Sequence, residues 1–523
     1  MKLDALLSLF KFREKRKEEA KVAKSSFVKP EYEYEVVESY WVLKPFAKVD
    51  IGYVAEEGSL FYFVIEEQLD PYERRVYEKL IDFLGKELEP PEDPDVDPIK
   101  YVTDEARRIL DRYRRSFRVR DEHSKEKILY YVARDLAGYG PIHVMMLDPN
   151  IEDISCNGVG RPIYVWHRRY ESLPTNVVFT DERELDDFII KLAHMAGKHI
   201  SSAHPIIDAT LPGKHRLAAT FMREVSTSGS TFCIRKFRER PFSIIELIDL
   251  GTLNETIAAY LWILVENKMS LMIIGGTGSG KTTTLNAILS MIRPEMKIVT
   301  VEETAEINLI HDNWVQFIAR ESFKFGATSE TASITLFDLV KTSLRYRPDY
   351  LIVGEIRGEE AYVLFQAIAT GHGGICTMHA DSLEYAIKRL TSKPMNIAPI
   401  YIPLMNACLL VERVKLPFRP KGPKFGRRIR NIWEIEDYGR YRVIASWDPV
   451  KDTFNVNLSN SILLDRIATR LGISKKDVID EIRRRSLFLR ELKSAGVMEF
   501  EEVTKAIREY YISVAENLGG GRK

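Results

Sequence analysis

Cysteine is scarce in this chain of 523 residues. The four cysteines lie far apart in the sequence, and no two of them form a C-x-x-C pair: Cys156, Cys233, Cys376 and Cys408. This spacing does not indicate a local zinc site. Isolated cysteines in such a chain are typically buried thiols of a reducing compartment, so we expect an intracellular protein.

Long apolar runs and a secretory leader are also missing. The longest apolar run near a helical pattern, Ile257–Val265, has nine residues, whereas a bilayer span needs about twenty. The apolar stretch Ala5–Phe10 is brief and is followed by charge rather than by a small-residue cleavage site. These features predict a soluble protein, which can still associate with a membrane-bound partner.

Charge of neither sign prevails, because 76 Lys and Arg residues balance 76 Asp and Glu residues. The balance gives no global electrostatic reason to expect nucleic acid or an anionic membrane as a partner. Apolar residues make up 45% of the chain, so most of it is expected to be globular. The length allows about three or four domains.

Composition and turn residues divide the chain into parts. The clearest break is 89–98, where four prolines and five acids in ten residues cannot bury a face. A second break follows Leu416, where prolines and a glycine cluster. The predicted parts are a basic arm (1–30), a small α+β domain (31–88), the linker (89–98), an α+β amino-terminal domain (99–240), a nucleotide domain (241–416), and C-terminal strands and helices (417–523).

The amino-terminal arm is basic, with eight Lys or Arg residues against four acids in 1–24. Its apolar residues fall at helical spacing: Leu3, Leu6, Leu7 and Phe10. Two interpretations stay open. The arm is either a mobile solvated tail or a contact to a partner or to a membrane surface.

The most informative stretch is a complete G-x-x-x-x-G-K-T phosphate loop. Leu271–Ile274 predicts a buried strand before the loop, and 283–291 predicts a helix after it. The glycines allow the backbone to direct N–H groups at a phosphate, while Lys281 can reach the β- and γ-phosphates and the Thr282 hydroxyl can bind Mg²⁺. The sequence therefore predicts nucleoside triphosphate binding by Gly275, Gly276, Thr277, Gly278, Ser279, Gly280, Lys281, Thr282 and Thr283.

Acidic and imidazole side chains follow three further predicted strands. The strands are 297–301, 350–354 and 374–378. Because the carboxyl ends of parallel strands meet at one edge of a sheet, we expect these ends to lie beside the phosphate loop. They carry Glu302, Glu303, Glu355 and His379. The alternative is that acids at strand ends are solvated loop residues.

Phosphoryl transfer requires mainly positioning and charge stabilisation, and these residues suit it. Glu355 is predicted to orient or deprotonate the attacking water. Glu302 and Glu303 would hold magnesium-bound water or orient the attacking water. The predicted metal residues are Thr282, Glu303 and Glu355. His379 could sense the γ-phosphate by donating a hydrogen bond. His372 is a further nucleotide candidate, although a lone histidine at a strand end is often only structural.

Four motifs in order resemble those of the type II/type IV secretion ATPase superfamily. Residues 369–374 and 377–382 resemble its histidine box, and 302–306 its acidic box. Residues 344–349 and 354–357 resemble its Walker B region. The resemblance covers about 206–382. Glu303, where the bacterial pattern usually has Asp, and the lack of a four-cysteine zinc module resemble the archaeal branch of the superfamily.

The resemblance implies an α/β fold, with a RecA-like P-loop NTPase domain built on a parallel sheet and preceded by an α+β domain. It implies a homo-hexameric ring that hydrolyses ATP with Mg²⁺, its nucleotide lying between the two halves of each subunit. Such rings power type II or type IV secretion, pili or archaella. They are cytoplasmic, lie at the inner face of the membrane and act on a polytopic membrane platform protein.

Arginines of the amino-terminal half form a separate group. Residues 206–216 resemble the family segment that ends in a nucleotide-contacting arginine, which makes Arg216 a candidate. In 234–238, alternation places Arg235 on the opposite strand face from Ile234, so Arg235 is the second candidate. An ordinary surface strand with salt bridges is the alternative. Weaker candidates are Arg223 and Arg238, while Arg345, Arg347 and Arg357 could serve subunit contacts.

Two other functions share parts of this pattern. A DNA-translocating or DNA-processing ATPase would also have a RecA-like core, but the neutral net charge and the lack of a basic, aromatic-rich patch argue against a nucleic-acid partner. A non-catalytic scaffold gated by nucleotide is the second alternative. The presence of Lys281, Glu302 and Glu355 together argues against that scaffold.

Overall fold

The computed structural model describes residues 32–89, 96–237, 240–320, 333–417 and 425–519. The chain divides into two compact units, 1–238 and 239–523, and each is described by itself. The basic arm and the centre of the predicted linker lie outside the described residues. Among the described residues, no helix has both the length and the apolar composition needed to cross a bilayer.

The first unit is built on a nine-stranded sheet with the order β1-β2-β3-β6-β5-β4-β9-β8-β7. Its strands are β1 (Glu35–Leu43), β2 (Ala47–Val54), β3 (Ser59–Glu66), β4 (Ile151–Cys156), β5 (Pro162–His167), β6 (Glu171–Val178), β7 (Ile206–Thr210), β8 (Arg216–Thr220) and β9 (Thr231–Arg235). Its helices are α2 (Pro71–Glu87), α3 (Pro98–Arg112), α4 (Arg114–Phe117), α5 (Glu122–Val132), α6 (His143–Leu147) and α7 (Glu182–Met195). The unit is α+β, as the sequence predicts.

The strands predicted within 32–65 do not form a sheet of their own. β3 pairs with β6 in parallel at Tyr62 and Thr175. Beside this pair, the Asn176 side chain accepts a hydrogen bond from the Val64 N–H at 2.8 Å and donates one to the Val64 carbonyl at 3.0 Å. The amide thus takes the place of a backbone partner and continues the sheet, a role that strand propensity does not reveal.

The segments before and after the acidic linker share a core. Val76, Leu80 and Leu84 of α2 belong to one buried cluster with Val102 of α3 and Ile128 of α5. The linker composition predicts local exposure of the backbone, but it carries no information on whether the flanking helices pack together.

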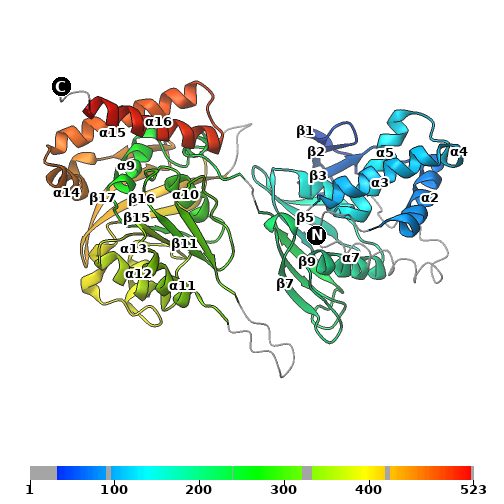
Figure 1. Cartoon of the computed structure of the whole chain (residues 1–523), viewed down its shortest axis with the longest axis horizontal. Helices are drawn as coiled ribbons and strands as arrows, with labels where there is room; N and C mark the ends of the chain where they lie inside the picture. Colours follow the sequence, from blue (N-terminus) through cyan, green and yellow to red (C-terminus); the bar gives the residue numbers. More distant parts are fainter. Residues whose placement is uncertain (1–31, 90–95, 238–239, 321–332, 418–424, 520–523) are drawn as a thin grey trace. The chain divides into compact units, whose positions relative to one another are not determined.

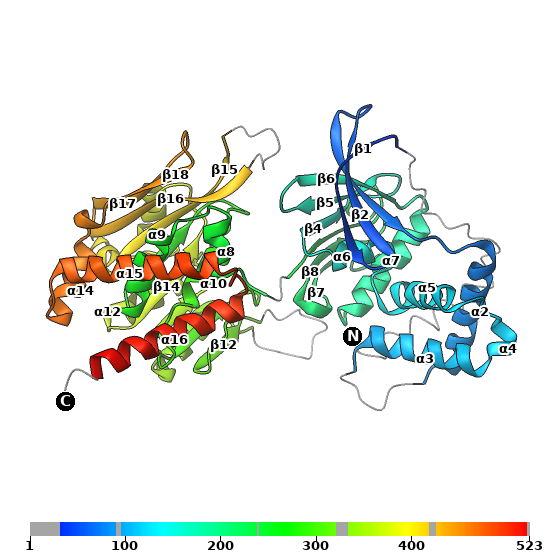
Figure 2. The same ribbon diagram turned by 90° about the horizontal axis from the view of Figure 1, so that it is seen from above.

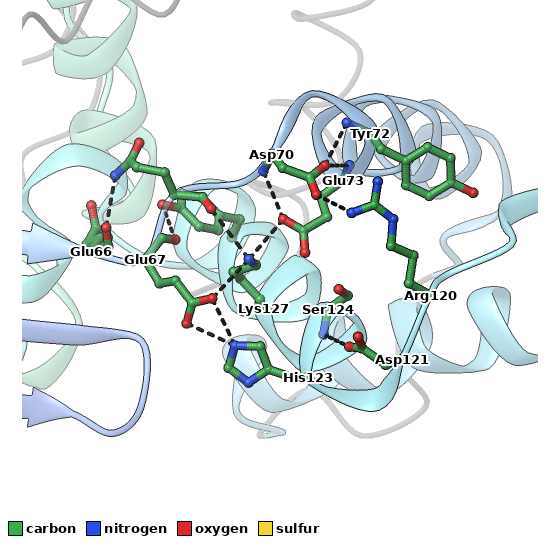
Figure 3. A network of polar contacts seen from close by, with 12 residues as sticks. Glu66, Glu67, Asp70, Tyr72, Glu73, Arg120, Asp121, His123, Ser124 and Lys127 are labelled. Atoms are coloured by element: carbon green, nitrogen blue, oxygen red, sulfur yellow. Dashed lines mark hydrogen bonds and ion pairs between the residues drawn. The ribbon is translucent and has the colours of Figure 1, made fainter.

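A charged network joins α2 and α5 at the end of β3 (Figure 3). The Lys127 ammonium lies 2.9 Å from a Glu73 carboxylate oxygen and 3.0 Å from one of Glu67. His123 lies 2.9 Å from Glu67, and Arg120 lies 2.6 Å from Asp70, the N-cap of α2. Because Lys127 and Glu73 are both buried, their pairing is what makes these charges tolerable inside the unit.

The second unit contains a second nine-stranded sheet, ordered β12-β11-β13-β14-β10-β15-β16-β17-β18. Its strands are β10 (Leu271–Ile274), β11 (Ile298–Glu302), β12 (Trp314–Ile318), β13 (Tyr350–Val353), β14 (Gly373–Met378), β15 (Ala407–Lys415), β16 (Phe425–Asp437), β17 (Arg440–Asp448) and β18 (Thr453–Val456). The six strands from β12 to β15 in this order are parallel, and β16 to β18 continue the sheet in antiparallel fashion.

Helices cover both faces of this sheet (Figure 1). Alternate residues of β10 belong to different cores: Leu271 and Ile273 pack with α9 and α10, while Met272 and Ile274 pack with α12 and α13. The helices are α8 (Ile244–Asp249), α9 (Glu255–Glu266), α10 (Lys281–Leu289), α11 (Leu336–Ser343), α12 (Glu360–Ala369), α13 (Leu383–Thr391), α14 (Ile462–Leu471), α15 (Lys475–Ser494) and α16 (Phe500–Gly519). This arrangement confirms the predicted α/β fold with a parallel sheet.

The C-terminal strands and helices belong to the same body as the parallel sheet. Glu434 of β16 is fully buried. Its carboxylate accepts hydrogen bonds from the Tyr260 hydroxyl at 2.6 Å, from the Ser461 hydroxyl, and from the Ile462 and Leu463 N–H groups at 2.7 and 3.1 Å. One carboxylate therefore joins the sheet, α9 and the start of α14.

Replacing Glu434 with Ala should destabilise the second unit, because the Tyr260 hydroxyl and the first N–H groups of α14 lose their buried acceptor. We expect the free energy of unfolding, measured by urea with tryptophan fluorescence, to fall by about 3 kcal/mol. Glu436→Ala is the matched control, since its ion pair with Arg442 on the same hairpin is exposed. Equal transitions for the two variants would contradict this account.

Candidate nucleotide site

The phosphate loop connects β10 to α10 and depends on glycine at two positions. Gly275 has φ 155°, and a Cβ added there would lie 2.1 Å from the Val411 carbonyl oxygen. Gly280 has φ 99° and precedes Lys281, the first residue of α10. The helix thus begins two residues earlier than the sequence predicts, because the left-handed Gly280 already serves as its N-cap.

The loop has the features of a phosphate cradle. The Ser279 hydroxyl is buried and has no hydrogen-bond partner among the residues that the structure describes. The Lys281 ammonium donates to the carbonyls of Gly275 and Gly276 at 3.0 and 2.9 Å. Burial lowers the pKa of Lys281, so a negatively charged ligand would be favoured beside it. The buried Ser279 hydroxyl and the Lys281 side chain, which turns back onto the loop carbonyls, both lie at a helix N-terminus and fit a phosphate.

His379 connects the loop to the predicted water-activating residue. Its Nδ1 lies 3.3 Å from the Lys281 ammonium, and its Nε2 lies 3.5 Å from a Glu355 carboxylate oxygen. Burial and the Lys281 charge lower the pKa of His379. A neutral imidazole with its proton on Nε2 suits both neighbours, because Lys281 can only donate. Lys281, His379 and Glu355 therefore form one chain of contacts, as the strand-end argument predicts.

Arg357 donates two hydrogen bonds to the carboxylate of Glu355. Its Nε and Nη2 lie 2.7 and 2.9 Å from the two Glu355 oxygens, and its Nη1 lies 3.4 Å from Glu303. Burial raises the pKa of Glu355, but Arg357, His379 and Lys281 outweigh that effect and hold it below its usual value. Arg357 thus brings Glu303 and Glu355 together, whereas Arg345 and Arg347 are exposed on the surface of this unit.

Glu302 does not lie beside Glu303 and Glu355 as an open site residue. It is the last residue of β11 and is only 3% exposed. Its carboxylate accepts from the N–H groups of Glu306 and Ile307, both at 2.8 Å, and from the Gln316 side chain at 2.8 Å. These contacts shape the loop that carries Glu303. Alternation along the strand turns the two neighbouring carboxylates in different directions.

His372 lies at the other edge of the sheet from the phosphate loop. It precedes β14, whereas His379 follows it, and a strand of this length separates its ends by roughly 20 Å. Its Nδ1 lies 3.0 Å from the Ala367 carbonyl and 3.1 Å from the Thr370 hydroxyl, at the end of α12. The structure does not bring His372 to this site and gives it a helix-capping position instead.

The predicted arginines Arg216 and Arg235 belong to the first unit. They face each other on β8 and β9, and each is exposed and paired with an acid. Arg216 lies 2.9 Å from Asp208, Arg235 lies 3.2 Å from Asp153, and the weaker candidate Arg223 lies 2.9 Å from Glu182. Arg238 lies outside the described residues. The action of these arginines on a nucleotide stays a prediction.

Arg427, an arginine of β16, contacts the phosphate loop, and no sequence pattern predicted this contact. Its Nε donates to the Gly278 carbonyl at 3.2 Å. Two acids, Glu306 and Asp381, also act electrostatically on Lys281. Glu306 lies within the acidic box, and Asp381 within the histidine box, so both carried a signal. Arg427 carried none, because only the pairing of β15 with β16 places it there.

The site fits Mg²⁺ only together with phosphate oxygens. No group of three or more His, Cys, Asp or Glu side chains that could hold a metal occurs in the described part of the chain. Thr282 is the second residue of α10, and Glu303 and Glu355 both contact Arg357. This pattern of one hydroxyl and few carboxylates is typical of a Mg²⁺ that keeps several waters and binds phosphates.

Comparison with known proteins places the chain in a family. Residues 135–412 match the family model described as type II/IV secretion system protein. An uncharacterized protein of Methanocaldococcus jannaschii is 37% identical over 421 residues, which are 78% of this chain and 74% of that protein. The conjugal transfer protein TrbB of Rhizobium radiobacter is 32% identical over 252 residues, 47% of this chain and 73% of that protein. The similarity to the Methanocaldococcus jannaschii protein confirms the predicted likeness to the archaeal branch.

Two solved structures are similar in fold at low sequence identity. The VirB11 ATPase of Brucella suis is 22% identical and covers 56% of this chain and 92% of its own, with a TM-score of 0.27. The Legionella pneumophila ATPase DotB is 18% identical and covers 68% of this chain and 91% of its own, with a TM-score of 0.40.

The burial of Glu302 makes the stability of the second unit depend on pH. Burial raises its pKa from 4.5 to about 7, so its contribution is fully present below pH 4.5 and is lost as the pH rises through 7. Relative to Glu302→Gln, the wild type should lose about 2.5 kcal/mol of unfolding free energy between pH 5 and 8. Urea unfolding at both pH values measures this, with Glu303→Gln as the exposed control. Parallel pH profiles for wild type and Glu302→Gln would show the prediction to be wrong.

Proposed function

The chain belongs to the type II/IV secretion system protein family, and we propose that it is an ATP-hydrolysing motor of this family. The observation that carries the proposal is the contact chain Lys281–His379–Glu355 at the phosphate loop. A buried lysine at a helix N-terminus binds phosphate, and a carboxylate linked to it through His379 can act on water. A scaffold that only binds nucleotide has no need of the second feature.

The residues divide the work of hydrolysis between them. Loop N–H groups and Lys281 hold the β- and γ-phosphates. Thr282, Glu303 and Glu355 would hold Mg²⁺ directly or through water, and the ion would supply charge neutralisation at the phosphates. Glu355 orients the attacking water and accepts its proton. Arg357 competes with that water, because its two hydrogen bonds take one acceptor position on each carboxylate oxygen.

His379 is suited to report the state of the γ-phosphate. It contacts both the lysine that binds this group and the carboxylate that acts on it. Loss of the γ-phosphate would remove the partner of Lys281 and change the hydrogen bond across the imidazole. Such a local change can be converted into movement when two packed arrangements of a protein differ little in free energy.

We further propose that the active form is a homo-hexamer, in which Arg216 and Arg235 stabilise the charge of the transferred phosphoryl group. The ring would act on a polytopic platform protein at the cytoplasmic face of the membrane and power secretion or the assembly of a pilus or archaellum. Family membership supports these proposals, and so does the relative named for conjugal transfer. A DNA-translocating ATPase would instead be stimulated by DNA at physiological salt.

Hydrolysis of Mg-ATP by the purified full-length protein is the direct test. Turnover should rise steeply with protein concentration as rings assemble. Lys281→Ala should lose ATP binding, and Glu355→Gln should retain binding while turnover falls by about 10²–10⁴. Glu359→Gln, an exposed acid four residues farther along, is the matched control. Undiminished turnover in Glu355→Gln would overturn the assignment of the water-activating residue.

The arginine proposal has its own test in the assembled ring. Arg216→Gln and Arg235→Gln should each lower turnover by about 10³ without changing ATP affinity to the same degree, because an arginine on the phosphoryl group acts mainly in the transition state. Arg183→Gln, an exposed arginine of the same unit, is the control. Sedimentation must show intact rings for each variant. Unchanged turnover in both would leave Arg216 and Arg235 as surface ion pairs.

A further inference from the structure

The strands β15 and β16 continue past the end of the sheet alongside the phosphate loop. The last pair between β10 and β15 joins Ile274 to Leu410. β15 then runs on for five residues to Lys415, paired with β16 from Phe425 to Ile429 (Figure 2). We name 411–415 with 425–429 the stem. The stem touches the loop, because a Cβ on Gly275 would lie 2.1 Å from the Val411 carbonyl oxygen.

One face of the stem lies on the same side of the sheet as α10. Val411 and Ile429 are opposite each other and belong to the buried cluster that contains Leu285 and Ile288 of α10. Two residues farther along the stem, Arg413 is opposite Arg427, and two residues beyond that pair, Lys415 is opposite Phe425. Since strand residues two apart share a face, these side chains extend the surface beside the N-terminus of α10.

Arg427 is held against the loop by its neighbour in the strand. The buried Arg428 forms two hydrogen bonds to Asp452, at 2.8 and 3.0 Å, and donates to the Leu250 carbonyl at 3.0 Å. This anchor fixes β16 from the opposite face. Arg427 then reaches the Gly278 carbonyl, and its Cδ lies 3.1 Å from the position of a Cβ on Gly280. Its guanidinium is placed over the tip of the phosphate loop.

The outer part of the stem presents flat groups. The Arg413 guanidinium lies 4.8 Å from the centre of the Phe425 ring, and Phe425 is 38% exposed. An aromatic ring and a stacked guanidinium are the groups on which a nucleobase binds without regard to its hydrogen-bonding edge.

Strand order fixes the direction in which a nucleotide would lie. β14 and β13, which precede His379 and Glu355 in the chain, are on one side of β10, and β15 and β16 are on the other. A triphosphate whose γ-phosphate contacts Lys281 on the His379 side therefore extends its α-phosphate and nucleoside toward the stem.

We propose that the stem is the nucleoside subsite of this nucleotide site. Arg427 binds the phosphate next to the ribose, and Phe425 with Arg413 stacks on the base. The ligand class is a nucleoside 5′-triphosphate or diphosphate. This inference rests on the proposed nucleotide binding at Lys281 and adds the residues that recognise the nucleoside.

Binding of Mg-ATP and of Mg-tripolyphosphate to the full-length protein separates the two parts of the site. By calorimetry, Phe425→Ala should weaken ATP binding about 10-fold and leave tripolyphosphate binding unchanged, because only ATP has a base to stack. Arg427→Gln should weaken both ligands, since both place a third phosphate near Arg427. Phe425→Tyr should keep the affinity for ATP. Arg430→Gln, exposed on the same strand and paired with Glu412, is the control.

The outcomes distinguish this subsite from the phosphate loop itself. Loss of both ligands in Lys281→Ala shows that the loop binds phosphate, whatever the stem does. If Phe425→Ala and Arg413→Gln then bind ATP as the wild type does, the nucleoside subsite lies elsewhere and the proposal fails. An equal loss of ATP and tripolyphosphate in Phe425→Ala would also overturn it, because the ring would then act only on the shape of the loop.

Discussion

The parallel pairing of β10 with β14 on one side and β15 on the other is the constraint on which the site depends. All four β10 residues are fully buried, so the strand cannot shift its register without moving apolar side chains between two cores. The phosphate loop begins where β10 ends, His379 where β14 ends, and the stem where β15 runs on. Motifs separated by 98 to 149 residues therefore meet at one edge.

The cations at this edge already have hydrogen-bond acceptors within the protein. Lys281 rests on loop carbonyls, Arg427 on the Gly278 carbonyl, and Arg357 on Glu355 and Glu303. A bound triphosphate would offer these cations stronger acceptors than they have now. Under the proposed function, binding would exchange these partners, and a shift of Arg357 toward a phosphate would open acceptor positions on Glu355. The buried Glu302 carboxylate holds the backbone of the acidic loop at Glu306 and Ile307.

Both units extend a sheet beyond the part that sequence patterns suggest. In the first unit, Asn176 joins β3 to β6, and α2 packs with α3 and α5 across the acidic linker. In the second unit, Glu434 ties β16 to α9 and α14. The connections at Asn176 and Glu434 each use a buried polar side chain whose hydrogen bonds are satisfied by distant segments. Such residues are costly to bury alone and therefore fix a particular arrangement of the chain.

The sequence by itself determined the phosphate loop, the strands that precede Glu303, Glu355 and His379, and the α/β fold. The glycines that the loop backbone requires and the apolar pattern of the strands specify these features. Only the tertiary structure decided that Glu302 is buried, that His372 lies at the opposite edge, that Arg357 holds Glu355, and that Arg427 contacts the loop. These outcomes depend on strand register and on which residue faces a core. Both are set by pairing between segments distant in sequence, which no local pattern records.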